Sequence, residues 1–292
     1  MTIDHRFLDY EKRYASRGQR LYYALLFTPP TVRHALIAIA GIQDSLHKIT
    51  QQSTEPSIRE GKLAWWQMEF NRLFAGNPEH PLTQMLISQP LRPEDPDVLP
   101  IHILPPALFQ EWIEGTRIQL QADHFCTMED LSFFTYRQQG IPHLLMAYLL
   151  TYPELPFFRE IEGLSTSLCL TTQLITLKTQ LIRGFCLFPL NWLHEANIKE
   201  QDLFASDWPA GVHALLDRLV DMIETAYQRG RQCCLNSAQR ASLLPLLIEA
   251  GLANQQLKAM LKKDLPQDGR LIDCSPFQKI WTTLRIAYTF RE

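Results

Sequence analysis

Apolar residues recur at steps of three and four along most of this chain, which is the spacing of one face of an α-helix. Between residues 31 and 49 this apolar face consists of Val32, Ala35, Leu36, Ile39, Ile42 and Leu46. Similar patterns predict helices over residues 57–75, 105–122, 155–181, 211–235, 237–261 and 276–288. A further helix is predicted to start after Thr127 and to break at Gly140-Ile141-Pro142, because proline interrupts a helix. No stretch shows convincing strand alternation, so the pattern predicts an all-α protein.

The predicted helices follow one another without a domain linker. Residues 89–105 form a proline-rich excursion, but apolar helices continue on both sides of it. We therefore expect a single domain over residues 1–292. Several helices are too apolar for the surface of a bundle and should be central. Helices of this kind can enclose an apolar cavity, whose chemistry depends on the polar groups that line it.

Composition narrows the choice of function. The chain has 28 basic and 31 acidic residues, a net charge of −3, which argues against binding to nucleic acid. Hydrophobic residues make up 46% of the chain, which argues against disorder. The sequence contains none of the GxSxG, HExxH, GxxxxGK[ST] or GxGxxG motifs, and its histidines lack metal-ligand spacing.

The lack of a recognisable targeting signal and the spacing of the cysteines favour a cytoplasmic protein. No apolar run is long enough to span a bilayer, and the N-terminus lacks the apolar segment of a signal peptide. The 6 cysteines form no CxxC pair. Reduced, mostly buried thiols are the expected state, with a redox role for Cys233-Cys234 as the alternative.

Two polar groups of residues are candidates for a site. Asp44, His47 and Lys48 share one helix face, because they lie three and four residues apart. They form either a polar rim on a cavity or an ordinary ion pair at a solvated helix end. The second group is a polar stripe at helical spacing, in which Arg183 could meet an anion. It consists of Gln173, Thr176, Gln180 and Arg183. A plain helix surface is the alternative interpretation of this stripe.

Adjacent tryptophans stand within the predicted helix 57–75. Trp65 and Trp66 point about 100° apart on a helix, so each should pack against a different neighbour. We expect them to have a structural role.

Several segments together resemble the squalene/phytoene synthases over nearly the whole chain. They are residues 24–38 (ALLFTPPTVRHALIA), 62–66 (KLAWW) with 74–81 (FAGNPEHP), Gln173-Leu174, Arg183-Gly184 with 188–193 (FPLNWL), 237–245 and 275–281. The resemblance implies the all-α isoprenoid synthase fold. In that family, two aspartate-rich motifs on facing helices hold Mg²⁺ ions. These ions bind the diphosphates of two prenyl diphosphates and assist ionisation of one of them.

The chain departs from this pattern at both motifs. The first aligns with Asp44-Ser45-Leu46-His47-Lys48, which keeps one acid and ends in a cation. The second aligns with residues 179–184 (TQLIRG), which contain no acid. Mg²⁺ prefers carboxylate ligands, so no metal or other cofactor is expected, and Asp44, His47 and Lys48 are the remnant of the first motif. The candidate ligand-binding residues are Arg33, Asp44, Gln173, Thr176, Gln180 and Arg183.

A subgroup of the family fits this loss of acids. Glu55-Pro56 and the acid-free link before Arg183-Gly184 resemble proteins related to a mitochondrial assembly factor for respiratory complex I. The resemblance implies a non-catalytic protein that binds a prenyl or lipid-like ligand or a protein partner at the membrane. It would act in the cytoplasm, with peripheral contact at the inner membrane as a further option.

The alternative hypothesis is an active prenyl transferase that uses Mg²⁺ with unconventional ligands. Its candidate ligands are Asp44, Asp123, Glu129 and Asp130.

Overall fold

The computed structural model describes residues 5–51, 55–121, 124–154, 158–205, 208–236, 240–262 and 273–290. All named elements in these ranges are helical, and the only β-type pairing among them is an isolated bridge between Arg92 and Asp95. The predicted all-α class is therefore confirmed. None of the helices within these ranges is long and apolar enough to cross a membrane.

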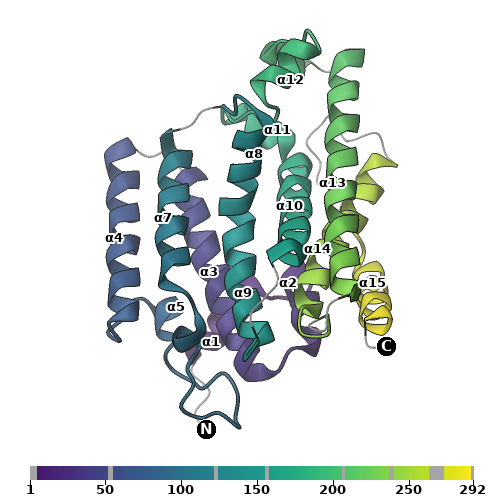
Figure 1. The fold of residues 1–292 in the computed structure, drawn as a ribbon. Helices are drawn as coiled ribbons and strands as arrows, with labels where there is room; N and C mark the ends of the chain where they lie inside the picture. Colours follow the sequence, from purple (N-terminus) through teal and green to yellow (C-terminus); the bar gives the residue numbers. More distant parts are fainter. Residues whose placement is uncertain are drawn as a thin grey trace.

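Most of the long helices run side by side along one direction (Figure 1). They are α3 (Pro30–Gln51), α4 (Pro56–Phe74), α7 (Pro106–Gln121), α8 (Met128–Thr135) with α9 (Ile141–Thr151), α10 (Phe158–Ile175), α13 (Ala210–Asn236) and α14 (Leu244–Leu261). Helices α4 and α7 lie at one side of the bundle, and α13 and α14 lie at the other.

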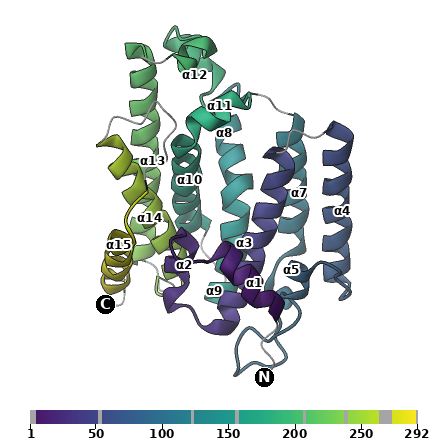
Figure 2. The ribbon, with the colours of Figure 1, turned by 180° about the vertical axis from the view of Figure 1, so that it is seen from behind.

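Shorter helices cover the ends and the back of the bundle. They are α1 (His5–Tyr14), α2 (Arg20–Ala24), η1 (Leu25–Phe27), α5 (Pro81–Gln84), α6 (Pro100–Ile103), α11 (Leu177–Ile182), α12 (Leu190–Glu195), η3 (Glu200–Phe204) and α15 (Pro276–Thr289). Seen from behind, α1 crosses α3, and α2 lies beside α14 (Figure 2). Only α15 among these, and α11 as part of a longer segment, were predicted from the sequence.

The predicted break at Gly140-Ile141-Pro142 is wrong. A π-helical turn, η2 (Tyr136–Gly140), carries the chain from α8 into α9 without interruption. In an α-helix the carbonyl of Gln138 would accept from residue 142, but Pro142 has no N–H. Gln43 of α3 donates to that carbonyl instead, at 2.8 Å. The side chain of a neighbouring helix thus replaces the bond that proline removes.

Two further boundaries differ from the prediction. The segment predicted as one helix over residues 155–181 is divided at Thr176 into α10 and α11, and residues 155–157 lie outside the described ranges. Helix α14 was predicted to begin at residue 237, but it begins at Leu244 and has Pro245 in its first turn. Residues 237–239 lie outside the described ranges. Proline suits the first turn of a helix, where no intrahelical N–H bond is required.

Helix α10 connects two buried clusters of apolar side chains. Its Ile161 and Leu164 belong to the larger cluster around α3, α4, α7, α9 and α14. Its Leu170 and Leu174 belong to the second cluster, around α8, α11, α12 and α13. The two clusters thus share helix α10.

The cysteines follow the expectation from their spacing. All six are free, and four of them, Cys169, Cys186, Cys234 and Cys274, are buried. Burial raises the pKa of the Cys169 and Cys234 thiols to about 12. Buried protonated thiols are poor nucleophiles, which favours packing over redox chemistry for Cys234.

Candidate functional site

The candidate residues of the first motif lie near the end of α3. The Lys48 ammonium is 2.5 Å from a carboxylate oxygen of Asp44, one turn earlier on the same helix. Tyr14 of α1 lies against Gly41, where a side chain would collide with the ring, and hydrogen-bonds Asp44. Burial, followed by the negative charge of Asp44, raises the pKa of Tyr14 to about 12. The one acid of this motif is therefore already occupied by a cation and a phenol.

His47 sits beside this pair and is kept uncharged at neutral pH. Burial lowers its pKa, and the positive charges of Arg183 and Lys48 act in the same direction. A hydrogen bond with Gln138 and the charge of Asp44 oppose this shift without overcoming it.

Arg183 reaches this group from α11. Its guanidinium donates to the side-chain oxygen of Gln51, the last residue of α3. The ends of α3 and α11 are thereby brought together. We call the group formed by Asp44, His47, Lys48, Gln51 and Arg183 the α3–α11 cluster. It combines two fixed positive charges with one carboxylate.

The rest of the predicted stripe does not converge on this cluster through any described hydrogen bond. Thr176 lies between α10 and α11, and its hydroxyl donates to the backbone oxygen of Thr172 at 2.9 Å. Gln173 and Gln180 are buried, and the side-chain oxygen of Gln173 has no hydrogen-bond partner. The division between α10 and α11 changes the helical register that placed these residues on one face.

Arg33 is separated from the other candidates. It pairs with Glu11 at 3.7 Å and donates to the backbone oxygen of Thr28 at 3.2 Å. Arg33 precedes Asp44 by 11 positions on α3, which at 1.5 Å per residue is about 16 Å along the helix.

A hollow of about 290 Å³ opens beside Lys48, between α3 and α4. It is lined by Ser45, Lys48, Ile49, Lys62, Trp65 and Trp66. The two tryptophan rings meet edge to face with centroids 5.4 Å apart, and Trp66 packs on His80 and Phe70. The expected packing role is confirmed for Trp66, which is buried, while Trp65 also forms part of this hollow.

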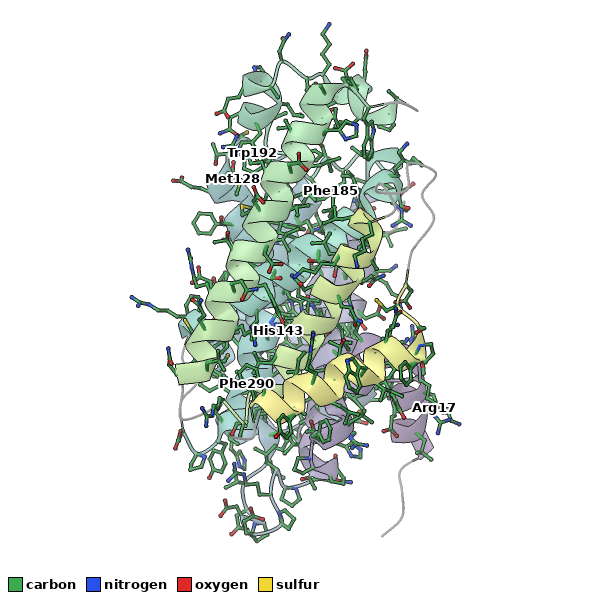
Figure 3. The ribbon with its side chains drawn as sticks, turned by 90° about the vertical axis from the view of Figure 1, so that its right-hand side faces the viewer. Arg17, Met128, His143, Phe185, Trp192 and Phe290 are labelled. Carbon is green, nitrogen blue, oxygen red and sulfur yellow. The ribbon has the colours of Figure 1, made fainter. Side chains whose placement is uncertain are left out.

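The bundle interior holds a polar network that the sequence analysis did not identify. The fully buried His143 of α9 lies inside the bundle (Figure 3). Its Nε2 is 2.6 Å from the amide nitrogen of Gln139 and 3.8 Å from a carboxylate oxygen of Glu249, while its Nδ1 is 3.0 Å from the hydroxyl of Ser165. The sequence signal was a lone histidine within an apolar helix, which by itself does not reveal its partners.

Arg20 of α2 continues this network towards α10. It donates to the Thr172 hydroxyl at 3.0 Å. Burial lowers the Arg20 pKa, against the opposing charges of Glu249 and Asp273. Burial disfavours the charged form of Glu249 too, but His143 and Arg20 outweigh it and keep the pKa of Glu249 below its usual value. These charges compensate each other inside the bundle, where unpaired charges are costly.

A groove of about 550 Å³ runs between α8–η2 and α13, with α10 at its floor. Its lining includes Phe133, Tyr136, Phe158, Ser165, Met222 and Arg229. Ser165 connects the groove floor to His143. Mostly apolar walls with a few polar groups suit an elongated organic ligand.

The donor set does not fit the Mg²⁺ ions that the family resemblance implies. Among the described residues, no three His, Cys, Asp or Glu side chains lie close enough to hold a metal. Asp44 is paired with Lys48, and Asp130 caps α8 by accepting from the backbone nitrogens of Cys126 and Thr127. Glu129 lines the groove, and Asp123 lies outside the described residues.

Comparison with known proteins agrees with this fold. A model of the squalene/phytoene synthase family matches residues 15–272. The 15-cis-phytoene synthase of Synechococcus elongatus is 28% identical over 235 residues, which cover 75% of this chain and 73% of that protein. The corresponding synthase of Synechocystis sp. is 23% identical over 201 residues, covering 65% of this chain and 57% of that protein.

Two solved structures show the same architecture. A dehydrosqualene synthase in complex with ligand superposes with a TM-score of 0.80 at 15% identity, covering 98% of this chain and 96% of that one. A squalene synthase from Alicyclobacillus acidocaldarius superposes with a TM-score of 0.72 at 18% identity, covering 88% and 93%. At these identities the likeness shows the fold alone.

Proposed function

The chain belongs to the squalene/phytoene synthase family, whose synthases are prenyltransferases, and on that premise we propose that it binds an anionic prenyl or lipid-like ligand without converting it. The observation that carries the proposal is the α3–α11 cluster. Where the synthases carry acids for a metal, this chain has Lys48 bonded to its one remaining acid, and Arg183 on the second helix.

The charge balance of the cluster supports binding over ionisation. Departure of a diphosphate from an allylic carbon requires strong neutralisation of the leaving group, which Mg²⁺ supplies when it is bound by carboxylates. One lysine and one arginine attract an anion but concentrate far less positive charge. The cluster should therefore hold a phosphorylated head group in its unreacted form.

The hollow beside Lys48 suggests where the ligand's first atoms would lie. Lys48 and Lys62 can meet an anionic head group, while Ile49, Trp65 and Trp66 offer apolar surface. This combination of cations and aromatic walls suits an amphipathic molecule.

Binding and turnover can be measured together with farnesyl diphosphate. We expect calorimetry to show binding that is unchanged by EDTA, and chromatography to show no condensed product with Mg²⁺ present. The double substitution Lys48→Ala/Arg183→Ala should weaken binding by about a hundredfold or more, because it removes two charge-assisted hydrogen bonds that each contribute about 1.5–3 kcal/mol. Lys258→Ala, which removes an exposed lysine of α14, is the matched control.

The opposite outcome would establish the alternative function. If Mg²⁺ allows formation of a squalene- or phytoene-type product, and Asp44→Ala abolishes it, the chain is an active prenyl transferase. A Kd that the double substitution leaves unchanged would place the ligand elsewhere.

A role in assembling a membrane respiratory complex is a finer hypothesis. It is supported by the resemblance of Glu55-Pro56 and the acid-free residues 179–184 to the assembly-factor subgroup. Deletion of the gene in its source organism should then lower NADH-dependent respiration and leave isoprenoid content unchanged. Loss of an isoprenoid with normal respiration would reject this role.

A further inference from the structure

Helix α15 presents a continuous apolar stripe that no described part of the chain covers. Its five large apolar side chains are exposed by the following fractions: Phe277 76%, Ile280 44%, Trp281 63%, Leu284 50% and Tyr288 71%. At 100° per residue they fall within an arc of about 100° on the helix. Single exposed apolar residues are common, but a contiguous group of this kind marks an interaction surface.

The opposite face of α15 holds the helix firmly on the bundle. Ile286 is buried against α14 at Gly251, where an added Cβ would come within 2.4 Å of its Cδ1. Lys279 is buried too, and its ammonium donates to the backbone oxygen of Gly18 at 2.6 Å and to Asp273 at 2.6 Å. Ser275 caps the start of the helix through Gln278. The stripe is therefore displayed on a docked, preformed helix.

The helix that carries the stripe has two basic residues, Lys279 and Arg285. Residues 276–289 contain no Asp or Glu, and Arg285 is exposed at the flank of the apolar arc. The positive charges of Arg285 and Arg231 both act to lower the pKa of Tyr227, while Glu224, which is paired with Lys258, acts to raise it. Arg17, next to the Gly18 carbonyl that Lys279 contacts, lies at the other end of the helix (Figure 3). The nearby acid Asp273 is paired with Lys279.

We propose that α15 docks the protein onto an anionic lipid surface, with its apolar stripe in the interface and the flanking arginines at the lipid phosphates. Tryptophan and tyrosine favour the membrane–water interface, and basic flanks add attraction to anionic lipids. This surface is separate from the α3–α11 cluster, so the proposal does not depend on the proposed ligand binding.

The exposed area favours a lipid surface over a second copy of this chain. Aromatic side chains offer about 150–250 Å² each and the two aliphatic ones somewhat less, so at their exposed fractions the five side chains of the stripe present on the order of 600 Å². A stable protein interface needs about 800 Å² on each partner. One helix of 14 residues is too small for that, whereas insertion into a lipid interface needs only a short amphipathic helix.

Co-sedimentation with vesicles tests the proposal on the full chain. We expect binding to vesicles of phosphatidylglycerol and phosphatidylcholine that is weaker at high salt, and less binding to phosphatidylcholine alone. Trp281→Ser/Leu284→Ser should reduce the partition coefficient by at least about tenfold, since each substitution removes apolar area from the interface. Arg285→Ala should reduce binding to the anionic vesicles and have little effect on binding to the neutral ones.

Phe204→Ser provides a matched control. Phe204 is 53% exposed on η3, so its replacement removes the exposed surface of one large apolar side chain elsewhere, as Trp281→Ser alone does on the stripe. Circular dichroism should show that all variants are folded, because the replaced side chains lie on the surface.

Three results would overturn the proposal. They are an absence of vesicle binding by the unmodified chain, an equal loss of binding in Phe204→Ser, and a dimer that Trp281→Ser/Leu284→Ser dissociates while vesicle binding is unchanged. The last result would assign the stripe to a second copy of the chain. A protein that binds the vesicles but not farnesyl diphosphate would contradict only the proposed ligand binding, and lipid docking by α15 would still hold.

Discussion

Glu69 of α4 is a fully buried carboxylate that the fold keeps charged. It accepts from the backbone nitrogens of Glu79 and His80 at 2.9 and 2.8 Å, from Arg72 at 2.9 Å, and from the Thr83 hydroxyl. Burial alone would raise the pKa of Glu69, but these donors outweigh it and lower the pKa below its ordinary value. One side chain thus fastens residues 79–83 to α4.

The lowered pKa of Glu69 makes part of the stability dependent on pH. Its contribution is present above the pKa of the unfolded chain, about 4.3, and is lost as pH falls through the lower pKa of the folded state. We expect Glu69→Gln to lower the free energy of unfolding at pH 7 by about 3 kcal/mol, since it disrupts a buried charged network. Chemical denaturation between pH 3 and 7 measures this, and the variant should show a weaker dependence on pH.

A neighbouring acid controls for the loss of charge. Glu79 is 67% exposed at its side chain, so Glu79→Gln should leave both the stability and its pH dependence nearly unchanged. Equal effects of the two substitutions would show that Glu69 has no special role.

At the scale of elements, the packing of α10 on α13 depends on two glycines. A Cβ added at Gly163 would lie 2.6 Å from the backbone nitrogen of Gly230, and one added at Gly230 would lie 2.6 Å from that of Leu164. The helix backbones meet directly at this point. The crossing also sets the position of α13 beside the groove floor, because Gly163 lines the groove.

Alanine at this crossing should destabilise the protein. Gly163→Ala forces the two backbones apart, and overpacking of this kind costs about 1–3 kcal/mol despite the better helix propensity of alanine. The control is Gly61→Ala in α4, where no atom lies within 4 Å of the added Cβ. That substitution should stabilise the protein by about 0.5–1 kcal/mol. Thermal unfolding measures both, and a shift of the same sign would contradict this account.

At the scale of the whole molecule, α10 contributes side chains to both apolar clusters. Ile42 in the first cluster and Leu170 in the second are both fully buried. If residues 1–292 form one domain, the clusters should unfold together even in a chain of this length.

Substitution in either cluster tests that cooperativity. Ile42→Ala and Leu170→Ala should each cost about 2–5 kcal/mol and move the same single transition. Near-ultraviolet circular dichroism and calorimetry should report coincident midpoints, with equal calorimetric and van't Hoff enthalpies. A transition that splits in only one variant would divide the chain into two independently unfolding parts.

The sequence alone predicted most long helices. Helical periodicity is local, so α3, α4, α7, α13 and α15 were located within a few residues. The loss of acids at both motif positions is implied by the family resemblance and stays a prediction, although no three metal-binding side chains meet among the described residues. The break predicted at Pro142 was wrong, because the side chain of Gln43 donates to the carbonyl of Gln138 that Pro142 leaves without a partner. Local sequence does not reveal this bond, since Gln43 lies 99 positions before Pro142.

Tertiary structure decided which of these residues meet and which faces stay uncovered. Arg183 meets Gln51 at the end of α3 only through tertiary packing, which spacing does not encode. The distance of Arg33 from Asp44, in contrast, follows from their spacing on one helix. His143 and Glu249 stand more than a hundred residues apart in sequence and meet only through the packing of α9 and α14. The amphipathic pattern of α15 showed that one face would be apolar. Only the assembled bundle showed that Ile286 is buried and that Trp281 remains exposed, because burial depends on neighbours supplied by the rest of the chain.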